Sequence, residues 1–289
     1  MIPITGEIRA FLTANAAQQT PRNDEYLDAS DGLLHCKACH GLRQTVIPNP
    51  KGSGFLAPRC LCSCQSKAIQ TQKAQEKAHE RLEHIQRRKA QGLQDRRFYD
   101  CTFANDSGKN PALTAKAKRY VEHWENIFRK NIGLLLFGDV GTGKSFLAGC
   151  IANALLEQDV PVLMTNFPTI LHRMTGLFGS ERVDFLASLN DYDLLILDDL
   201  GAERGTEFAL EQVFSVIDAR YRSQKPLIVT TNLTLEQMKH PADLVHARVY
   251  DRIFEICAPI LCNGENQRAE KAAEMRRAAR KLLLPETAA

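Results

Sequence analysis

The sequence lacks several features that would point to a membrane or secreted protein. No stretch approaches the roughly 18 uninterrupted apolar residues of a membrane-spanning helix, and the N-terminus lacks the basic start and apolar core of a secretory signal. The net charge of +3 is too small to establish a nucleic-acid partner by itself. We therefore expect a soluble, cytoplasmic protein with no membrane partner, whose nine cysteines stay reduced.

Apolar runs that alternate with helical patterns fill the chain from Ile132 onward. Runs of that length, separated by helices, are typical of a parallel sheet covered on both faces. The sequence therefore predicts an α/β fold with a five-stranded parallel sheet. The predicted strands are 134–137, 162–164, 194–197, 227–229 and 256–261.

A glycine-rich motif lies between the first of these runs and the helical pattern of 146–157. It fits G-x-x-x-x-G-K-[ST], in which backbone amides surround phosphate oxygens at a helix N-terminus. Lys144 would then reach the terminal phosphates of ATP, and the Ser145 hydroxyl would bind magnesium. A glycine turn before an ordinary helix is the alternative, which the strand and helix context disfavours. The predicted nucleotide-binding residues are Gly138, Asp139, Val140, Gly141, Thr142, Gly143, Lys144, Ser145 and Phe146.

Polar residues close two later strands. The run at 194–197 ends in Asp198 and Asp199, and the run at 227–229 is followed by two threonines and Asn232. Carboxyl ends of parallel strands form the ligand crevice of open sheets, so we expect Asp198 to bind magnesium and Asp199 to orient the attacking water. Asn232 either contacts the water or terminal phosphate, or caps the helix that follows. Solvated turn residues are the alternative for the aspartates.

These motifs resemble those of the DnaC-type replicative helicase loaders, which belong to the AAA+ ATPases. The related DnaI loaders and IstB transposition ATPases share much of the pattern. The resemblance covers about residues 98–268, is strongest to DnaC-like proteins of phages and mobile elements, and includes the segment 98–106 before the ATPase core. The matching motifs are G-D-V-G-T-G-K-S at 138–145, D-L-L-I-L-D-D-L-G-A-E-R at 193–204, Y-R-S-Q-K-P-L-I-V-T-T-N at 221–232, A-R-V-Y-D-R-I at 247–253 and G-E-N-Q-R at 264–268.

The resemblance assigns roles to three arginines. Arg248 and Arg252 sit where the family carries arginines that reach a neighbouring subunit's nucleotide, and both lie on one helical face. Arg268 matches the arginine that the family uses as a second nucleotide sensor. Surface salt bridges are the alternative for each. The short chain after the last strand leaves no room for a full helical lid, which also resembles the loaders.

Cysteines cluster near the N-terminus, in a segment rich in Gly and Pro that can build little apolar core. Cys36 and Cys39 form a C-x-x-C pair, followed by the closely spaced Cys60, Cys62 and Cys64. Four thiolates suit tetrahedral zinc, which can fold such a segment. We predict zinc bound by Cys36, Cys39, Cys62 and Cys64. If Cys62 or Cys64 is not a ligand, Cys60 is the first alternative. His35 and His40 come after it.

A basic segment follows the cysteines. Between residues 66 and 97 there are nine Lys or Arg against four Asp or Glu, in a sequence that favours helix. This excess could follow a phosphate backbone or be the solvated face of a connecting helix. No aromatic cluster in the sequence indicates a platform for stacking bases. We divide the chain into a zinc-binding, helicase-interacting module at 1–64, a basic helical linker at 65–100 and an AAA+ ATPase domain at 101–289.

The resulting hypothesis is a slow, partner-stimulated ATPase that uses ATP and magnesium to load a hexameric replicative helicase onto single-stranded DNA. An arginine that acts on a neighbour requires an oligomer, so we expect head-to-tail self-assembly, either by the protein alone or only on the helicase. Two alternatives stay open. One is an IstB-like transposition helper, and the other is a zinc-dependent adaptor that uses ATP only structurally.

Overall fold

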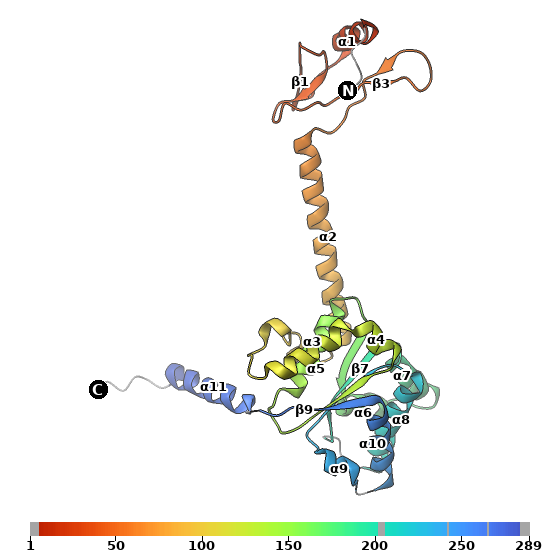
Figure 1. The fold of residues 1–289 in the computed structure, drawn as a ribbon, viewed down its shortest axis with the longest axis vertical. Helices are drawn as coiled ribbons and strands as arrows, with labels where there is room; N and C mark the ends of the chain where they lie inside the picture. Colours follow the sequence, from red (N-terminus) through yellow and green to blue (C-terminus); the bar gives the residue numbers. More distant parts are fainter. Residues whose placement is uncertain (1–5, 202–205, 242, 265, 284–289) are drawn as a thin grey trace, which may run out of the picture. The chain divides into compact units, whose positions relative to one another are not determined.

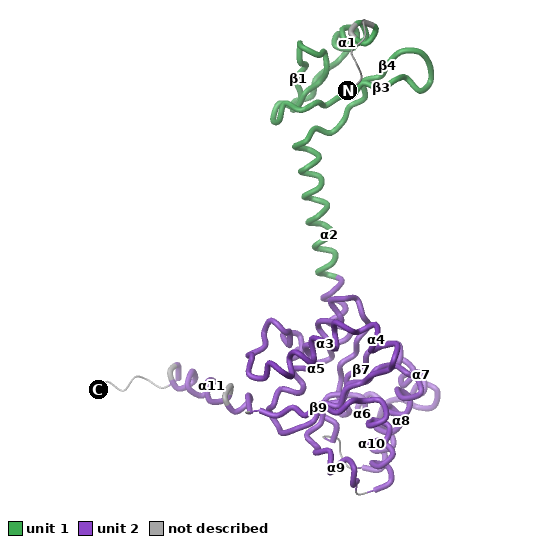
Figure 2. The backbone as a smooth tube through the Cα atoms, viewed as in Figure 1, with its two compact units in different colours: residues 1–83 green, residues 84–289 purple. Residues whose placement is uncertain are grey.

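The chain folds into two separate units (Figure 2). The computed structural model describes residues 6–201, 206–241, 243–264 and 266–283. The first unit spans residues 1–83 and the second 84–289. None of the helices in these described ranges is long and apolar enough to cross a membrane.

A five-stranded parallel sheet organises the second unit (Figure 1). Its strands lie in the order β6-β7-β8-β5-β9, so the strand that precedes the glycine-rich motif lies between β8 and β9. The five predicted strands are confirmed, although Ile256 ends a helix and does not begin the last strand. The strands are β5 (Gly133–Phe137), β6 (Val162–Asn166), β7 (Leu194–Leu200), β8 (Leu227–Thr231) and β9 (Cys257–Leu261).

Both faces of the sheet are covered by helices, which is why the strands read as unbroken apolar runs. Leu134 and Leu136 point into one core and Leu135, between them, into the other. The first core includes α3 (Pro111–Glu122), α4 (Trp124–Arg129) and α5 (Lys144–Leu156). The second core includes α6 (Phe167–Thr175), α7 (Ser180–Leu189), α8 (Glu207–Ser223), α9 (Leu235–Lys239) and α10 (Leu244–Ile256). The last helix, α11 (Gln267–Leu283), follows β9.

Short polar side chains start the helices that leave the sheet. The Asn166 side chain accepts a hydrogen bond from Thr169 at the start of α6, and Asp243 does the same from His246 at the start of α10. Thr234 caps α9 and forms a capping box with Gln237. Thr234, and not Asn232, is therefore the cap of this helix, which removes one of the two readings of Asn232.

The first unit has little apolar core. Its helix α1 (Gly6–Gln18) contributes Ile8 and Leu12 to a small buried cluster with Leu33. Two short antiparallel hairpins, which the sequence did not indicate, pair β1 (Glu25–Leu27) with β2 (Leu34–Cys36) and β3 (Ile47–Pro48) with β4 (Phe55–Leu56). The predicted helix after the cysteines is α2 (Ser63–Gly92), which ends at Gly92 as expected.

One arginine of the second unit is fully buried and joins the two loops that precede β7 and β8. Arg220 lies on α8 with 0% exposure, and burial lowers its pKa to about 10, so it stays charged at neutral pH. Its guanidinium donates to the carbonyls of Tyr192 and Asp193 before β7, at 2.9 and 2.7 Å. It also donates to the carbonyl of Pro226 before β8, at 2.7 Å. A buried arginine is stable here because carbonyl oxygens satisfy its donors.

We expect Arg220→Met to lower the free energy of unfolding by about 3 kcal/mol, because three buried carbonyls lose their donor. The matched control is Arg222→Met on the same helix, whose side chain is 75% exposed and pairs with Asp218. The control should lose less than about 1 kcal/mol. Urea denaturation followed by circular dichroism measures both, and equal losses would contradict the assignment.

Candidate nucleotide site and cysteine cluster

A cleft of about 510 Å³ opens over the loop that joins β5 to α5. It lies at the carboxyl edge of the sheet, where the ends of β7 and β8 also arrive. Ten of the predicted nucleotide-site residues line it: Val140, Gly141, Gly143, Lys144, Ser145, Phe146, Asp198, Asp199, Asn232 and Arg268. The glycine-rich loop and the paired aspartates thus face one shared space.

The loop has the left-handed backbone that its glycines permit. Gly138 and Gly141 have φ of 138° and 85°, and a Cβ at Gly141 would collide with the side chain of Asn266. The ammonium of Lys144 donates to the carbonyls of Gly138 and Asp139 at 2.8 and 2.7 Å. Burial lowers the pKa of Lys144, an effect that the nearby Asp199 carboxylate opposes. The third donor of the ammonium is left for an oxygen in the cleft.

The two aspartates lie in a β-bulge near the end of β7. The register with β8 shifts between Leu197 and Leu200, and Asp199 has a left-handed φ of 63°. Asp198 is buried and accepts a hydrogen bond from the Thr230 hydroxyl at 2.7 Å. Asp199 is exposed and accepts from the Asn232 amide at 3.1 Å. The bulge therefore presents two adjacent carboxylates in different environments.

The first turn of α11 lies against the glycine-rich loop. The backbone N–H of Gln267 donates to the carbonyl of Gly141 at 3.0 Å. The N–H of Arg268 donates to the Asn266 side chain at 3.0 Å, and the Arg268 side chain is exposed at the cleft. A predicted sensor arginine thus stands beside the loop.

The segment 98–106 forms another wall of the cleft. Phe98 and Cys101 line the cleft, and the buried amide of Asn153 on α5 donates to their carbonyls at 2.7 and 2.9 Å. Sequence reasoning identified the segment by resemblance but did not select these residues. The signal available was Asn153 itself, a polar residue within an apolar helix.

Two predicted arginines lie away from this cleft, on α10. Arg248 is exposed. Arg252 stacks over the ring of Tyr221 at 4.2 Å, and its guanidinium lies 3.6 Å from both Asp218 and Glu255. The proposed action on a neighbouring subunit stays a prediction.

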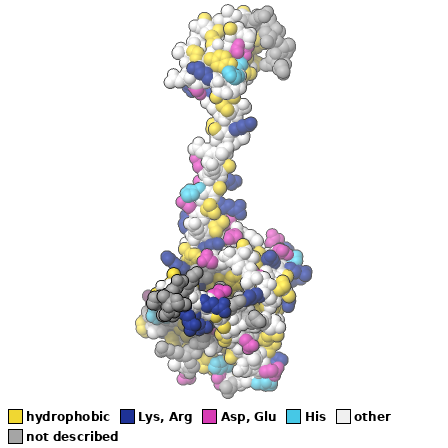
Figure 3. Space-filling view, turned by 90° about the vertical axis from the view of Figure 1, so that its left-hand side faces the viewer, with side chains coloured by type: hydrophobic (Ala, Val, Ile, Leu, Met, Phe, Trp, Pro, Cys, Tyr) yellow, Lys and Arg dark blue, Asp and Glu magenta, His cyan; other side chains and the backbone are white. Residues whose placement is uncertain are grey.

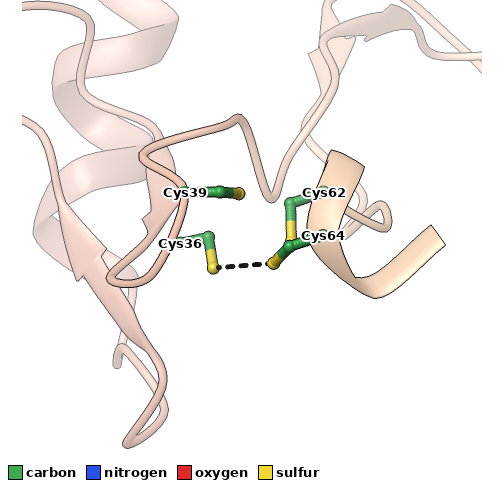
Figure 4. Close-up of side chains that lie close together, drawn as sticks. All are labelled: Cys36, Cys39, Cys62 and Cys64. Carbon is green, nitrogen blue, oxygen red and sulfur yellow. Dashed lines mark hydrogen bonds between the residues drawn. The ribbon is translucent and has the colours of Figure 1, made fainter. Parts of the chain in front are cut away.

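The first unit brings the four predicted cysteine ligands together (Figure 4). The Sγ atoms of Cys36, Cys39, Cys62 and Cys64 all lie within 4.8 Å of one another. Four sulfurs bound to one zinc at about 2.3 Å stand about 3.8 Å apart. The distance between the Sγ atoms of Cys36 and Cys64 is 3.7 Å, so this donor set fits tetrahedral zinc.

The alternative ligands have other contacts. The Cys60 thiol points to the Leu42 carbonyl at 3.7 Å. His35 binds Asp31 and the His40 carbonyl, and the His40 ring contacts the Tyr26 hydroxyl. The structure therefore favours Cys62 and Cys64 as the second pair.

Hydrogen bonds within the cluster shift the pKa values of two thiols in opposite directions. Backbone N–H groups of Cys64 and Gly41 lower the pKa of Cys39 to about 5. Hydrogen bonds with the other three thiols raise the pKa of Cys64 to about 12. A divalent metal bound to all four sulfurs would displace the thiol protons.

A sequence profile of IstB-like ATP binding proteins matches residues 65–275. The chain belongs to this family. The match contains the whole nucleotide cleft and begins one residue after Cys64, so the IstB-like family itself does not account for the cysteine cluster. Residues 202–205, within one of the motifs, lie outside the described residues.

Curated relatives of this IstB-like chain include proteins of DNA replication. The replicative helicase loader DnaC of Escherichia coli (strain K12) is 32% identical over 162 residues, which are 53% of this chain and 63% of that protein. The replicative helicase loader DnaI of Bacillus subtilis (strain 168) is 29% identical over 48% of each chain. The phage-like element PBSX protein XkdC of the same strain is 32% identical over 50% of this chain and 55% of that protein. The chain thus spans only about half to two thirds of these relatives.

Two solved structures are similar to this IstB-like chain. A crystal structure of DnaI has 26% sequence identity, covers 60% of this chain and 93% of that chain, and gives a TM-score of 0.48. A crystal structure of the DnaC helicase loader has 22% identity, covers 58% and 100% of the two chains, and gives the same TM-score of 0.48.

We expect the full-length protein to carry one zinc ion and Cys39→Ala to lose it, because tetrahedral zinc needs all four sulfurs of the cluster. Cys60→Ala is the matched control, since Cys60 lies in the same segment outside the cluster. It should keep its zinc. Elemental analysis after gel filtration measures both, and equal zinc loss from the two variants would contradict the ligand set.

Proposed function

We propose that this protein is an ATP-dependent loader of a replicative DNA helicase onto single-stranded DNA. The observation that carries the proposal is the shared cleft in which a phosphate-binding loop faces two strand-end aspartates. The relatives named as replicative helicase loaders support the same function.

Each group in the cleft has a role in this proposal. The amides of 138–145 and Lys144 hold the phosphates of ATP. Ser145 and Asp198 hold the magnesium ion, with Asp198 oriented by the Thr230 hydroxyl. Asp199 activates the attacking water and is steadied by Asn232. Bound magnesium would neutralise part of the negative charge of the phosphates.

Neighbouring subunits complete the site. Arg248 on α10 is exposed and free to approach a nucleotide on the next subunit. Arg252 is held by Asp218 and Glu255 of its own chain, so it positions this surface until a neighbour's phosphate competes for it. Arg268 reads the nucleotide from its own cleft. The resulting contact is heterologous, which gives a head-to-tail assembly.

An exposed aromatic group supplies a surface for DNA bases. Arg182 stacks between Phe178 and Phe208, with its guanidinium carbon 5.8 and 5.4 Å from the two ring centroids. Phe178 is 73% exposed. The rings are thirty residues apart in sequence and form no cluster there, but both lie beside Arg182. Aromatic rings beside an arginine suit the stacking and charge of single-stranded DNA.

The helix α2 carries an excess of positively charged side chains. Figure 3 shows Lys and Arg side chains spaced along it, with acidic residues between them. Seven Lys or Arg and three Glu lie within 63–92, and most of these side chains are exposed. We assign this helix, which forms most of the linker at 65–100, a secondary role in DNA binding.

The other two parts of the chain have their own roles in this proposal. The zinc-binding module at 1–64 engages the helicase, and the domain at 101–289 hydrolyses ATP.

A transposition helper is the second candidate, because the family profile is named for IstB-like proteins. The cysteine cluster lies before that match, which favours the loader, whereas the basic helix α2 lies almost wholly within it. Affinity purification from the native host with ATP present separates the two: a loader retains a replicative helicase, and a transposition helper retains a transposase. An adaptor that uses ATP only structurally would show no ATP hydrolysis.

We expect Lys144→Ala to weaken ATP binding at least tenfold, because a charged hydrogen bond to phosphate is worth about 1.5–3 kcal/mol. It should also abolish ATP-dependent transfer of the helicase to single-stranded DNA. Isothermal titration and a helicase-loading assay on closed single-stranded circles measure the two effects. Retained ATP affinity would refute the site.

Asp199→Asn is the matched variant within the same cleft. It should bind ATP with nearly unchanged affinity and lose hydrolysis by about 100-fold or more, since it removes only the base. A variant that loses binding and hydrolysis together would place Asp199 on the nucleotide instead.

We expect the double change Phe178→Ala and Phe208→Ala to weaken binding of oligothymidylate about tenfold or more, because stacking is worth about 1–3 kcal/mol per base. Val183→Ala is the control, as Val183 lies on α7 next to Arg182, is 65% exposed and has no ring. Fluorescence anisotropy measures both proteins. If the control and the double variant bind alike, this surface does not contact DNA.

A further inference from the structure

The first unit buries a carboxylate that takes no part in the cysteine cluster. The Glu25 side chain has 0% exposure. Its Oε1 accepts from Nε and Nη2 of Arg43 at 3.2 and 3.0 Å. Its Oε2 accepts from the Arg22 backbone N–H at 3.2 Å and lies 3.4 Å from Nε of Arg59. Burying a carboxylate is unfavourable unless it is paired and hydrogen-bonded, so this arrangement holds Arg43 in one orientation.

The remaining nitrogen of that guanidinium faces a predicted metal ligand. Nη1 of Arg43 lies 3.8 Å from Sγ of Cys62, within hydrogen-bonding reach of sulfur. The Arg43 side chain is only 6% exposed, so water screens this contact little. A planar fork can bond a carboxylate on one side and a sulfur on the other, which the single ammonium of a lysine cannot do in the same geometry.

The backbone of Arg43 also joins the two halves of the cluster. Its N–H donates to the carbonyl of Leu34, two residues before Cys36, at 2.7 Å. Its carbonyl accepts from the N–H of Cys60, two residues before Cys62, at 2.7 Å. Glu25 is the register partner of Cys36 in the first hairpin. Arg43 and Glu25 thus stand between the first and the second cysteine pair.

A zinc ion bound by four thiolates would leave a negative charge that the Arg43 guanidinium can offset. Zinc with four thiolates has a formal net charge of about −2, and Cys36 and Cys62 are buried. We propose that Arg43 is a positioning residue of the zinc centre, which Glu25 orients so that its guanidinium donates to the zinc-bound Cys62 sulfur and offsets the charge of the tetrathiolate. The inference rests on the zinc site proposed above. Groups around the ligands of a metal typically change its affinity by about 10- to 100-fold.

Arg59 provides a matched control. It also pairs with Glu25 and carries the same charge, but its side chain is 37% exposed. Its Nη2 donates to the carbonyl of Thr20 and not to a cysteine sulfur. A purely structural salt bridge predicts similar effects for the two arginines. A role in the zinc centre predicts a large effect for Arg43 only.

The test compares full-length wild type, Arg43→Met and Arg59→Met in zinc competition against a chromophoric chelator. Arg43→Met should bind zinc about tenfold or more weakly, and Arg59→Met should stay within about threefold of wild type. In the cobalt-substituted proteins, Arg43→Met should shift the sulfur-to-cobalt absorption band, because Cys62 loses its donor, whereas Arg59→Met should leave the band in place. Equal zinc affinities or unshifted bands in the two variants would overturn the proposal.

A second variant keeps the test decisive if Arg43→Met leaves Glu25 buried without its partner and fails to fold. The double change Glu25→Gln and Arg43→Met removes that unpaired charge. It should fold and still bind zinc weakly, with the shifted cobalt band. Recovery of wild-type zinc affinity in the double variant would show a structural role only. A wild-type protein without stoichiometric zinc would instead overturn the zinc site itself, before either arginine is compared.

Discussion

The parallel pairing of β5, β8 and β7 is the constraint on which the nucleotide cleft depends. Parallel strands bring their carboxyl ends to one edge, so residues far apart in sequence arrive at a common place. Lys144 follows β5, Asp198 lies near the carboxyl end of β7, and Asn232 follows β8. Buried leucines on both faces of the sheet fix this register, because a shift of one residue would send each side chain into the opposite core.

The cleft was largely predictable because its chemistry is local. The glycine-rich loop and the strand-end aspartates are short motifs in recognisable contexts, and the structure brings them together. The bulge that separates Asp198 from Asp199 was not predictable, because it arises from the pairing of β7 with Thr230 and Thr231. The same holds for Phe178 and Phe208, which both contact Arg182 of α7 only because α7 packs beside α8. Tertiary contacts of this kind leave no local pattern in the sequence.

The first unit solves its shortage of apolar residues in a different way. Its buried cluster rests on Ile8, Leu12 and Leu33, which is little for a folding unit of this length. Four sulfurs and a buried ion-paired network of Glu25 and Arg43 take the place of a larger core. Sequence spacing identified the sulfurs, but Glu25 and Arg43 looked like ordinary surface charges until the hairpins placed them beside the ligands.

The hydrogen bond between Gln267 and Gly141 ties the end of the chain to the glycine-rich loop. The helix that begins there extends about 25 Å, at 1.5 Å per residue, and none of its described side chains is buried. A phosphate that changed the backbone of the loop at Gly141 would therefore also act on the first turn of this exposed helix.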